Sequence, residues 1–220
     1  MKNIRKISSR IAATLTLAVA AVPTVASVPA SAADDCADVH VIVVRGTGEP
    51  GRYGWIVGDG LVGKVRAKVP GTKATALDYP ASIGRDSVPT GITRLVSTIQ
   101  SRAAACPDER LVLVGYSQGA QVIDGALGVD LTGTPNAPVP VPAVVPRELA
   151  PHIAAITLFG DLVQKVGRSP GAPYAERAVQ YCQAKDVVLD PSPGSSFLPH
   201  LKYAFNGDLN RAATFIVDRV

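Results

Sequence analysis

The chain has 220 residues, of which 47% are hydrophobic and only 5% aromatic. Its formal net charge of +4 comes from four basic side chains among the first ten residues, because basic and acidic residues balance in the remainder. The basicity therefore gives no support for a nucleic-acid partner. The apolar content is mostly Ala and Val, which suits a buried parallel sheet covered by helices with small side chains.

Residues 1–33 have the pattern of a secretory signal peptide. A basic start is followed by an apolar stretch from Ile11 to Val28, and Ala30-Ser31-Ala32 offers the small residues of a cleavage site. Pro23 and Pro29 interrupt the stretch, which argues against a membrane anchor. We therefore expect residues 34–220 to form a single secreted domain with no stable membrane anchor.

Strand and helix patterns alternate along the rest of the chain. Five segments have the character of buried strands: Val39–Val44, Lys73–Tyr79, Leu111–Val114, His152–Phe159 and Arg177–Cys182. Four segments have helical spacing: Tyr53–Val69, Ser87–Ala105, Ala120–Leu127 and Asp208–Val220. This alternation predicts an α/β fold with a mostly parallel sheet. Residues 131–151 hold six prolines and predict a long surface excursion, which leaves open whether it is a lid.

The sequence Gly115-Tyr116-Ser117-Gln118-Gly119 directly follows one of these strands and precedes a helix. Glycines two residues before and after the serine suit a sharp strand-to-helix turn that exposes the hydroxyl at the positive end of the helix. The alternative is an ordinary turn in which the serine caps the helix. The context favours Ser117 as a nucleophile.

A nucleophilic serine needs a general base, and histidine is the usual one. The chain has three histidines. His40 lies within the first strand, and His152 opens a strand at the end away from the catalytic edge. His200 lies in a late loop after all the strands, where the order serine, acid, histidine of this architecture places the base. We therefore predict His200 as the base.

The base needs a carboxylate to fix its tautomer, and three aspartates follow the later strands. Asp161, Asp186 and Asp190 all lie beyond the carboxyl ends of strands, where ligands bind in this fold class. Asp186 is favoured because its strand comes nearest to His200 in chain order. Asp161 is the second candidate.

The tetrahedral intermediate of acyl transfer also needs hydrogen-bond donors, the oxyanion hole. The first donor is predicted to be the backbone N–H of Gln118, the residue after the serine. The loop Arg45-Gly46-Thr47-Gly48 after the first strand offers the second, through Thr47. A plain turn or an anion-binding nest is the alternative, whereas the lysine and spacing of a phosphate-binding P-loop are missing.

Three cysteines follow the predicted signal peptide. Cys36 and Cys106 each precede a strand, and parallel strands begin at one end of a sheet, so a disulfide between them is sterically reasonable. Cys182 is then left over, and we expect it to be a buried thiol at the end of a strand.

Taken together, these residues resemble the cutinase family of secreted serine esterases. The likeness covers nearly all of residues 34–220, in the right order. It rests on these motifs: Val44-Arg45-Gly46-Thr47-Gly48-Glu49, Tyr79-Pro80-Ala81, Gly115-Tyr116-Ser117-Gln118-Gly119-Ala120, Leu158-Phe159-Gly160-Asp161, Tyr181-Cys182 with Asp186, and His200-Leu201-x-Tyr203.

The resemblance implies a compact α/β-hydrolase fold, a three-layer sandwich with a five-stranded parallel central sheet. It implies a catalytic triad of Ser117, Asp186 and His200, oxyanion donors at Thr47 and Gln118, and a disulfide between Cys36 and Cys106. The implied activity is hydrolysis of cutin-like polyesters or of short- and medium-chain acyl esters, with no metal or organic cofactor. We expect the protein to act as a monomer on an ester substrate.

Two features differ from the family pattern. A second disulfide usually brackets the catalytic acid, but Cys182 lacks a partner and Leu189 stands where one is expected. Lys185 also precedes Asp186 where glycine is usual, so the acid loop is expected to be looser or held by packing. These differences motivate a second hypothesis, an exported binding protein on the same scaffold. A lipase or phospholipase with the same triad is the third.

Overall fold

A computed structural model describes residues 36–220, so the predicted signal peptide lies outside the described residues. Five parallel strands form one sheet in the order β2-β1-β3-β4-β5. They are β1 (Val39–Val44), β2 (Lys73–Ala76), β3 (Arg110–Tyr116), β4 (Ile153–Phe159) and β5 (Ala178–Tyr181). The predicted α/β fold with a five-stranded parallel sheet is confirmed.

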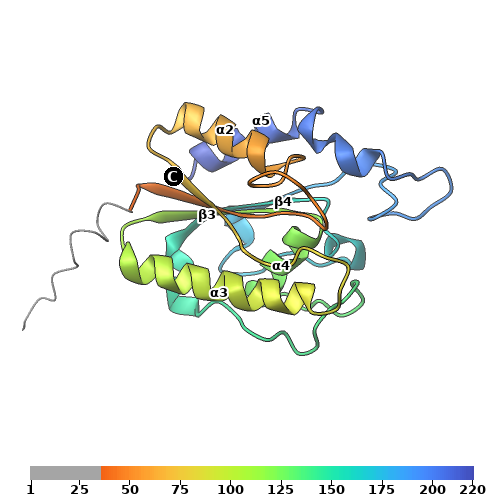
Figure 1. The fold of residues 1–220 in the computed structure, drawn as a ribbon, viewed down its shortest axis with the longest axis horizontal. Coiled ribbons are helices and arrows are strands. Elements are labelled where there is room, and N and C mark those ends of the chain that lie inside the picture. Colours follow the sequence, from red (N-terminus) through yellow and green to blue (C-terminus); the bar gives the residue numbers. More distant parts are fainter. Residues whose placement is uncertain (1–35) are drawn as a thin grey trace, which may run out of the picture.

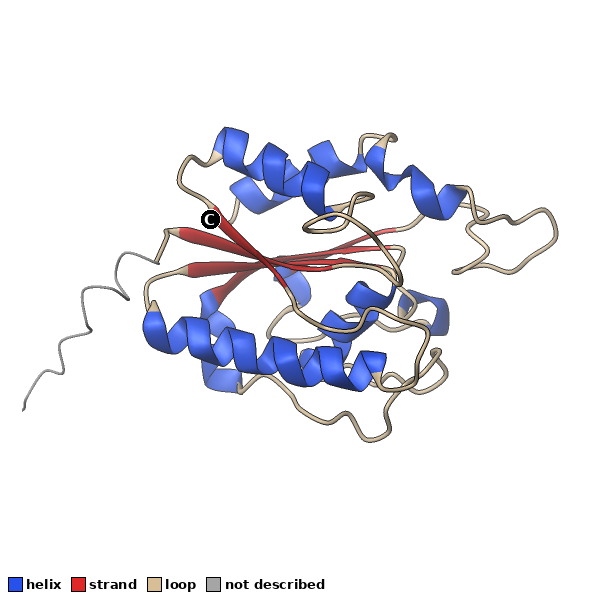
Figure 2. Ribbon diagram, viewed as in Figure 1, coloured by secondary structure: helices blue, strands red, loops and turns tan. Residues whose placement is uncertain are grey.

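Helices cover both faces of the sheet. α3 (Ser87–Ala105) and α4 (Gln118–Ala126) lie on one face, and α2 (Gly58–Lys68) and α5 (Asp208–Val217) lie side by side on the other (Figures 1 and 2). The arrangement is therefore the expected three-layer sandwich.

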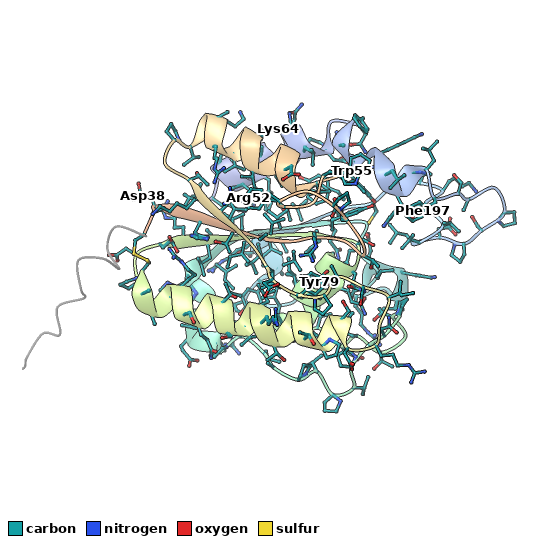
Figure 3. All side chains as sticks on the ribbon, viewed as in Figure 1. Asp38, Arg52, Trp55, Lys64, Tyr79 and Phe197 are labelled. Atoms are coloured by element: carbon teal, nitrogen blue, oxygen red, sulfur yellow. A yellow bond between two sulfur atoms is a disulfide. The ribbon has the colours of Figure 1, made fainter. Side chains whose placement is uncertain are left out.

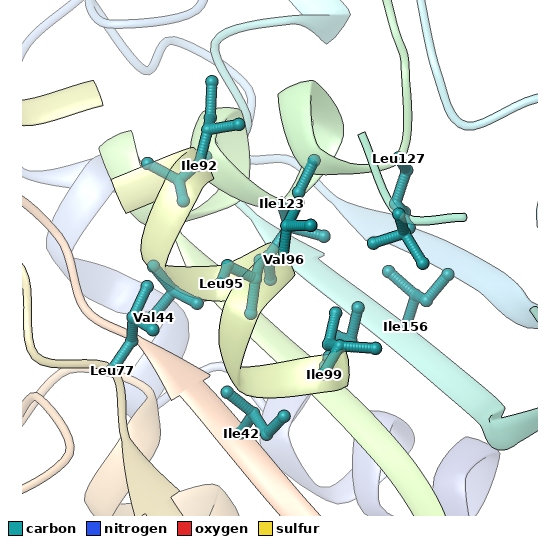
Figure 4. Packing of buried hydrophobic residues seen from close by; sticks show 14 of the residues in the cluster. Ile42, Val44, Leu77, Ile92, Leu95, Val96, Ile99, Ile123, Leu127 and Ile156 are labelled. Atoms are coloured by element: carbon teal, nitrogen blue, oxygen red, sulfur yellow. The ribbon is translucent and has the colours of Figure 1, made fainter. Parts of the chain in front are cut away.

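The central strands are apolar because both of their faces are buried. Side chains alternate between the faces, so Ile42 and Val44 of β1 join one core cluster while Val41 and Val43 join the other. In the first cluster, Ile92 of α3 packs with its neighbours over the sheet (Figure 4). Each such fully buried aliphatic side chain contributes about 1.5–3 kcal/mol.

Two predicted elements are shorter in the structure because side chains form hydrogen bonds with backbone groups at their ends. The helix predicted from Tyr53 begins at Gly58, since the N–H of Tyr53 donates to Asp59 and that of Ile56 donates to Glu49. The strand predicted to reach Tyr79 ends at Ala76, and the guanidinium of Arg45 donates to the carbonyls of residues 77 and 79.

The proline-rich segment, residues 131–151, is only partly a surface excursion. Leu131, Val145 and Ala150 are buried with the α3 and α4 side of the core, and the N–H of Val145 donates to the carbonyl of Ala126 in α4 at 2.8 Å. The segment ends in the 3₁₀ helix η1 (Arg147–His152). Within residues 36–220, no helix is both long enough and apolar enough to cross a membrane.

Candidate active site

Ser117 occupies the sharp turn between β3 and α4. Its backbone has φ 53° and ψ −120°, a region that non-glycine residues rarely adopt and that is typical of strained functional turns. A Cβ at Gly119 would overlap the carbonyl oxygen of Val44, so only glycine fits two residues after the serine. The turn places the serine at the N-terminus of α4, where the helix dipole favours negative charge.

His200 and Asp186 are joined by a hydrogen bond of 2.7 Å between Nδ1 and Oδ2. His200 is 2% exposed and Asp186 is fully buried. Because Nδ1 is engaged, Nε2 is the nitrogen left to accept a proton. Ser117 and His200 line the same cavity, and among residues 36–220 the Ser117 hydroxyl has no hydrogen-bond partner. Catalytic hydrogen bonds are often loose until substrate binds.

The residue before the serine also orients the histidine. Tyr116 donates a hydrogen bond from its hydroxyl to the backbone carbonyl of His200 at 2.9 Å, and the two rings lie 5.0 Å apart. Gly160 packs so closely that an added Cβ would lie 2.6 Å from Cε1 of the imidazole. The imidazole is therefore enclosed by β3, by the end of β4 and by Asp186.

The loop that carries Asp186 is held by backbone hydrogen bonds rather than by a second disulfide. The N–H of Ser196 donates to the carbonyl of Lys185 at 3.0 Å, and the N–H of Val187 donates to the carbonyl of Ser196 at 3.1 Å. Lys185 has φ 63° and so adopts the left-handed conformation, which costs glycine less conformational energy than any other residue. The N–H of Val188 also donates to Oδ1 of Asp186 at 2.9 Å, which fixes the carboxylate.

Asp161, the second candidate for the acid, faces a different partner. Its carboxyl group accepts hydrogen bonds from the N–H of Val163 and the side chain of Gln180, and the buried carboxyl group of Asp124 on α4 interacts with it electrostatically. Burial raises the pKa of Asp124 well above its usual value, and the neighbouring Asp161 raises it further. The protonated form of Asp124 is therefore favoured inside the fold.

The other predicted alternatives lie away from the cavity. Asp190 is exposed and accepts hydrogen bonds within its own turn. His40 is buried near the start of β1, where Nε2 is hydrogen-bonded to Thr75. His152 immediately precedes β4, and strand starts lie at the edge opposite Ser117.

The loop after β1 brings Thr47 to the wall of the cavity. Glu49 holds this loop, because its buried carboxylate accepts the N–H of Gly46 at 2.8 Å and the N–H of Ile56 at 2.7 Å. Burial raises the pKa of Glu49, while these two N–H groups lower it. The sequence interpretation gave Glu49 no role, although a carboxylate within a glycine-rich loop is a signal that could have suggested one.

Gln118 begins α4, so its N–H has no acceptor one turn earlier in the helix. Its side chain is nearly buried and is hydrogen-bonded to Ser82 and Ser87. The structure thus brings Thr47, Ser117 and His200 to one cavity, with Asp186 and Gln118 directly behind them.

The cavity beside Ser117 has a volume of about 480 Å³ and a largely apolar wall. Trp55, Ile83 and Phe197 line it and are also exposed, with Ile83 86% accessible. Trp55 and Phe197 lie toward the end of the molecule opposite Asp38, which immediately precedes β1 (Figure 3). The cavity therefore opens at the carboxyl edge of the sheet, between apolar side chains.

A disulfide joins Cys36 and Cys106, as the resemblance implied. The expectation of a buried thiol at Cys182 is wrong, because this residue is exposed and its sulfur is hydrogen-bonded to Gln164. Among residues 36–220, β5 is the edge strand of the sheet, so no further strand of this part of the chain lies beside the residue that follows it.

Comparison with known proteins identifies relatives of this fold and site. The family model for Cutinase matches residues 35–220. A protein described as a cutinase from Kineococcus radiotolerans is 37% identical over 188 residues, which cover 82% of this chain and 60% of that protein. A phospholipase, Culp4, from Mycobacterium tuberculosis is 34% identical over 220 residues, which cover 98% of this chain and 92% of that protein.

Among solved structures, the cutinase of Trichoderma reesei in complex with a phosphonate inhibitor superposes with a TM-score of 0.64 at 29% identity. The match covers 83% of this chain and 76% of that one. The chain spans less than two thirds of the length of the Kineococcus relative, so the two proteins are alike over their shared domain.

Proposed function

We propose that Ser117, His200 and Asp186 are the catalytic triad of this chain, which belongs to the cutinase family. Its matched domain is a carboxylic ester hydrolase. The observation that carries the proposal is the buried hydrogen bond between His200 and Asp186, on the cavity that Ser117 lines. A carboxylate on Nδ1 fixes the tautomer that leaves Nε2 basic, which a serine nucleophile requires.

In the proposed reaction, His200 takes the proton of Ser117 as the serine oxygen attacks the ester carbonyl. The N–H groups of Thr47 and Gln118 stabilise the negative charge that develops on the carbonyl oxygen. His200 then protonates the leaving alcohol, and an acyl-enzyme remains on Ser117. Water repeats the sequence, releases the carboxylic acid and regenerates the serine. Asp186 stabilises the imidazolium of His200 both when the acyl-enzyme forms and when water hydrolyses it.

The proposed substrates are cutin-like polyesters or short- and medium-chain acyl esters. A largely apolar wall and a volume of about 480 Å³ support an acyl chain bound beside the serine. Exposed Trp55, Ile83 and Phe197 at the mouth support access for esters that are attached to a polymer or a lipid. A lipase or phospholipase activity of the same triad is favoured by the likeness to the phospholipase. Turnover of a series of esters of increasing acyl-chain length separates an esterase for short- and medium-chain esters from a lipase or phospholipase.

We also propose that the protein is secreted and acts as a monomer. The disulfide between Cys36 and Cys106 supports an oxidising compartment. The predicted signal peptide supports export.

The test is Ser117→Ala with p-nitrophenyl butyrate as substrate. We expect turnover to fall to background while the circular dichroism spectrum and the urea midpoint stay close to those of the wild type. Unchanged turnover would reject the assignment. An inert wild-type protein that also fails to react with a fluorophosphonate would favour the binding-protein hypothesis, because only an activated serine is labelled.

A further inference from the structure

A short segment between β2 and α3 contacts the residue next to one predicted oxyanion donor and the side chain of the other. The N–H of Gly48, next to Thr47, donates to the carbonyl of Ala81 at 2.7 Å. The side-chain Nε2 of Gln118 donates to the carbonyl of Ser82 at 2.8 Å. Two successive carbonyls of this segment are therefore bonded to the two sides of the oxyanion hole.

A buried hydroxyl closes this arrangement into a ring of three hydrogen bonds. Ser87 donates from Oγ to Oε1 of Gln118 at 2.8 Å, and the N–H of Ser82 donates to the same Oγ at 3.0 Å. Ser87 is 1% exposed and Gln118 is 5% exposed. We call Ser82, Ser87 and Gln118 the Ser87 clamp. The hydrogen bond between Ser87 and Gln118 is buried and the other two are partly buried, so the three together restrict the segment to one arrangement.

The backbone next to the clamp is held in an unfavourable conformation. Ala81 has φ 48°, which lies in the left-handed region that side chains other than glycine rarely adopt. Such conformations persist only where the surrounding contacts enforce them. The carbonyl of Ala81 is the group that holds Gly48, so relaxation at Ala81 would shift the loop that carries Thr47.

We propose that Ser87 is a positioning residue for the oxyanion hole. Its hydroxyl holds the Gln118 side chain and the Ser82 backbone, so that the spacing between the N–H groups of Thr47 and Gln118 is set before substrate arrives. This inference rests on the proposed serine-esterase function. Donors that are fixed in advance stabilise the transition state without reorganisation, and losing one costs about 10²–10³-fold in kcat in other enzymes.

The first test is the variant Ser87→Ala, which removes two hydrogen bonds of the clamp. We expect kcat for p-nitrophenyl butyrate to fall by about tenfold or more, since the donors are loosened rather than deleted. KM should stay within about twofold, because the clamp acts on the transition state rather than on ground-state binding. Rates are expressed per active serine, counted by fluorophosphonate titration, so that partial unfolding does not imitate a catalytic loss.

Helix α4 supplies a matched control for the amide. Gln121 is also buried, and its Nε2 donates to Thr134 and to the carbonyl of Pro135, both at 2.8 Å. Gln118→Leu and Gln121→Leu therefore make the same chemical change on one helix, and each removes two hydrogen bonds. We expect both variants to lower the urea midpoint, but only Gln118→Leu to lower kcat.

A double variant tests whether Ser87 and Gln118 act as one unit. Ser87→Ala combined with Gln118→Leu should lose no more kcat than the larger single change, because either change breaks the ring. The proposal is overturned if Ser87→Ala keeps kcat within twofold of the wild type, or if Gln121→Leu loses as much kcat as Gln118→Leu. If Ser87→Ala does not fold, the comparison of Gln118→Leu with Gln121→Leu decides: an equal loss of kcat in the two variants overturns the proposal. An active enzyme that depends on Ser117 but not on Ser87 rejects the clamp and leaves the proposed function standing.

Discussion

Gly160→Ala should separate the geometry of the proposed triad from the stability of the fold. Gly160 follows β4 with φ 57°, and a Cβ there would lie 2.6 Å from Cε1 and 3.0 Å from Nδ1 of His200. Ordinary carbon contacts are about 3.5–4.0 Å. The imidazole must therefore move by roughly 1 Å, or the backbone must give way. A misplacement of that size costs about 10²-fold in rate.

The matched control is Gly167→Ala. Gly167 also has a positive φ, 73°, but an added Cβ meets nothing within 4 Å. Both variants place alanine in the left-handed region, at a cost of about 1–2 kcal/mol. We expect both to lower the urea midpoint, while only Gly160→Ala lowers kcat for p-nitrophenyl butyrate by about 10²-fold. The reasoning is refuted if the two variants have equal kcat, since the contact with His200 would then have no catalytic consequence.

Two further predictions concern stability. Because burial raises the pKa of Asp124, the native state releases this proton at a higher pH than the unfolded chain does. The stability tied to the proton is full below about pH 4, and it falls by about 1.4 kcal/mol per pH unit as the pH rises toward the native pKa. Asp124→Asn should lack this loss, so the difference in urea midpoint between variant and wild type should widen from pH 5 to pH 8. A constant difference would contradict the raised pKa of Asp124. The disulfide spans 70 residues, so replacing Cys36 and Cys106 together by serine should cost about 4 kcal/mol by loop entropy and lower Tm by about 10 °C. A calorimetric Tm within 2 °C of the wild type would argue against that contribution.

The sequence predicted those features that depend on local pattern and chain order. Apolar runs indicated the central strands because both faces of a parallel sheet are buried. The spacing of the glycines around Ser117 indicated the turn, since no larger side chain fits at Gly119. The order of the triad on this architecture then favoured His200 and Asp186 as partners of Ser117.

The features that depend on contacts between distant segments were not predictable in the same way. The carboxylate of Glu49 delays the start of α2 and holds the loop that carries Thr47. It does so through the backbone N–H groups of Gly46 and Ile56, and the sequence pattern does not tell which N–H groups a carboxylate will bind. The exposure of Cys182 follows from the position of β5 at the sheet edge, which depends on strand order. The clamp at Ser87 likewise joins residues that are 31 positions apart.

The most direct test of the central claim is to locate the covalent adduct of a fluorophosphonate probe. The probe is incubated with the wild-type protein until ester hydrolysis stops, and the modified peptide is sequenced by mass spectrometry. We predict one adduct per chain, on the hydroxyl of residue 117, and a large loss of labelling rate in His200→Ala. An inactivated protein whose adduct lies on any other residue would contradict the proposed nucleophile.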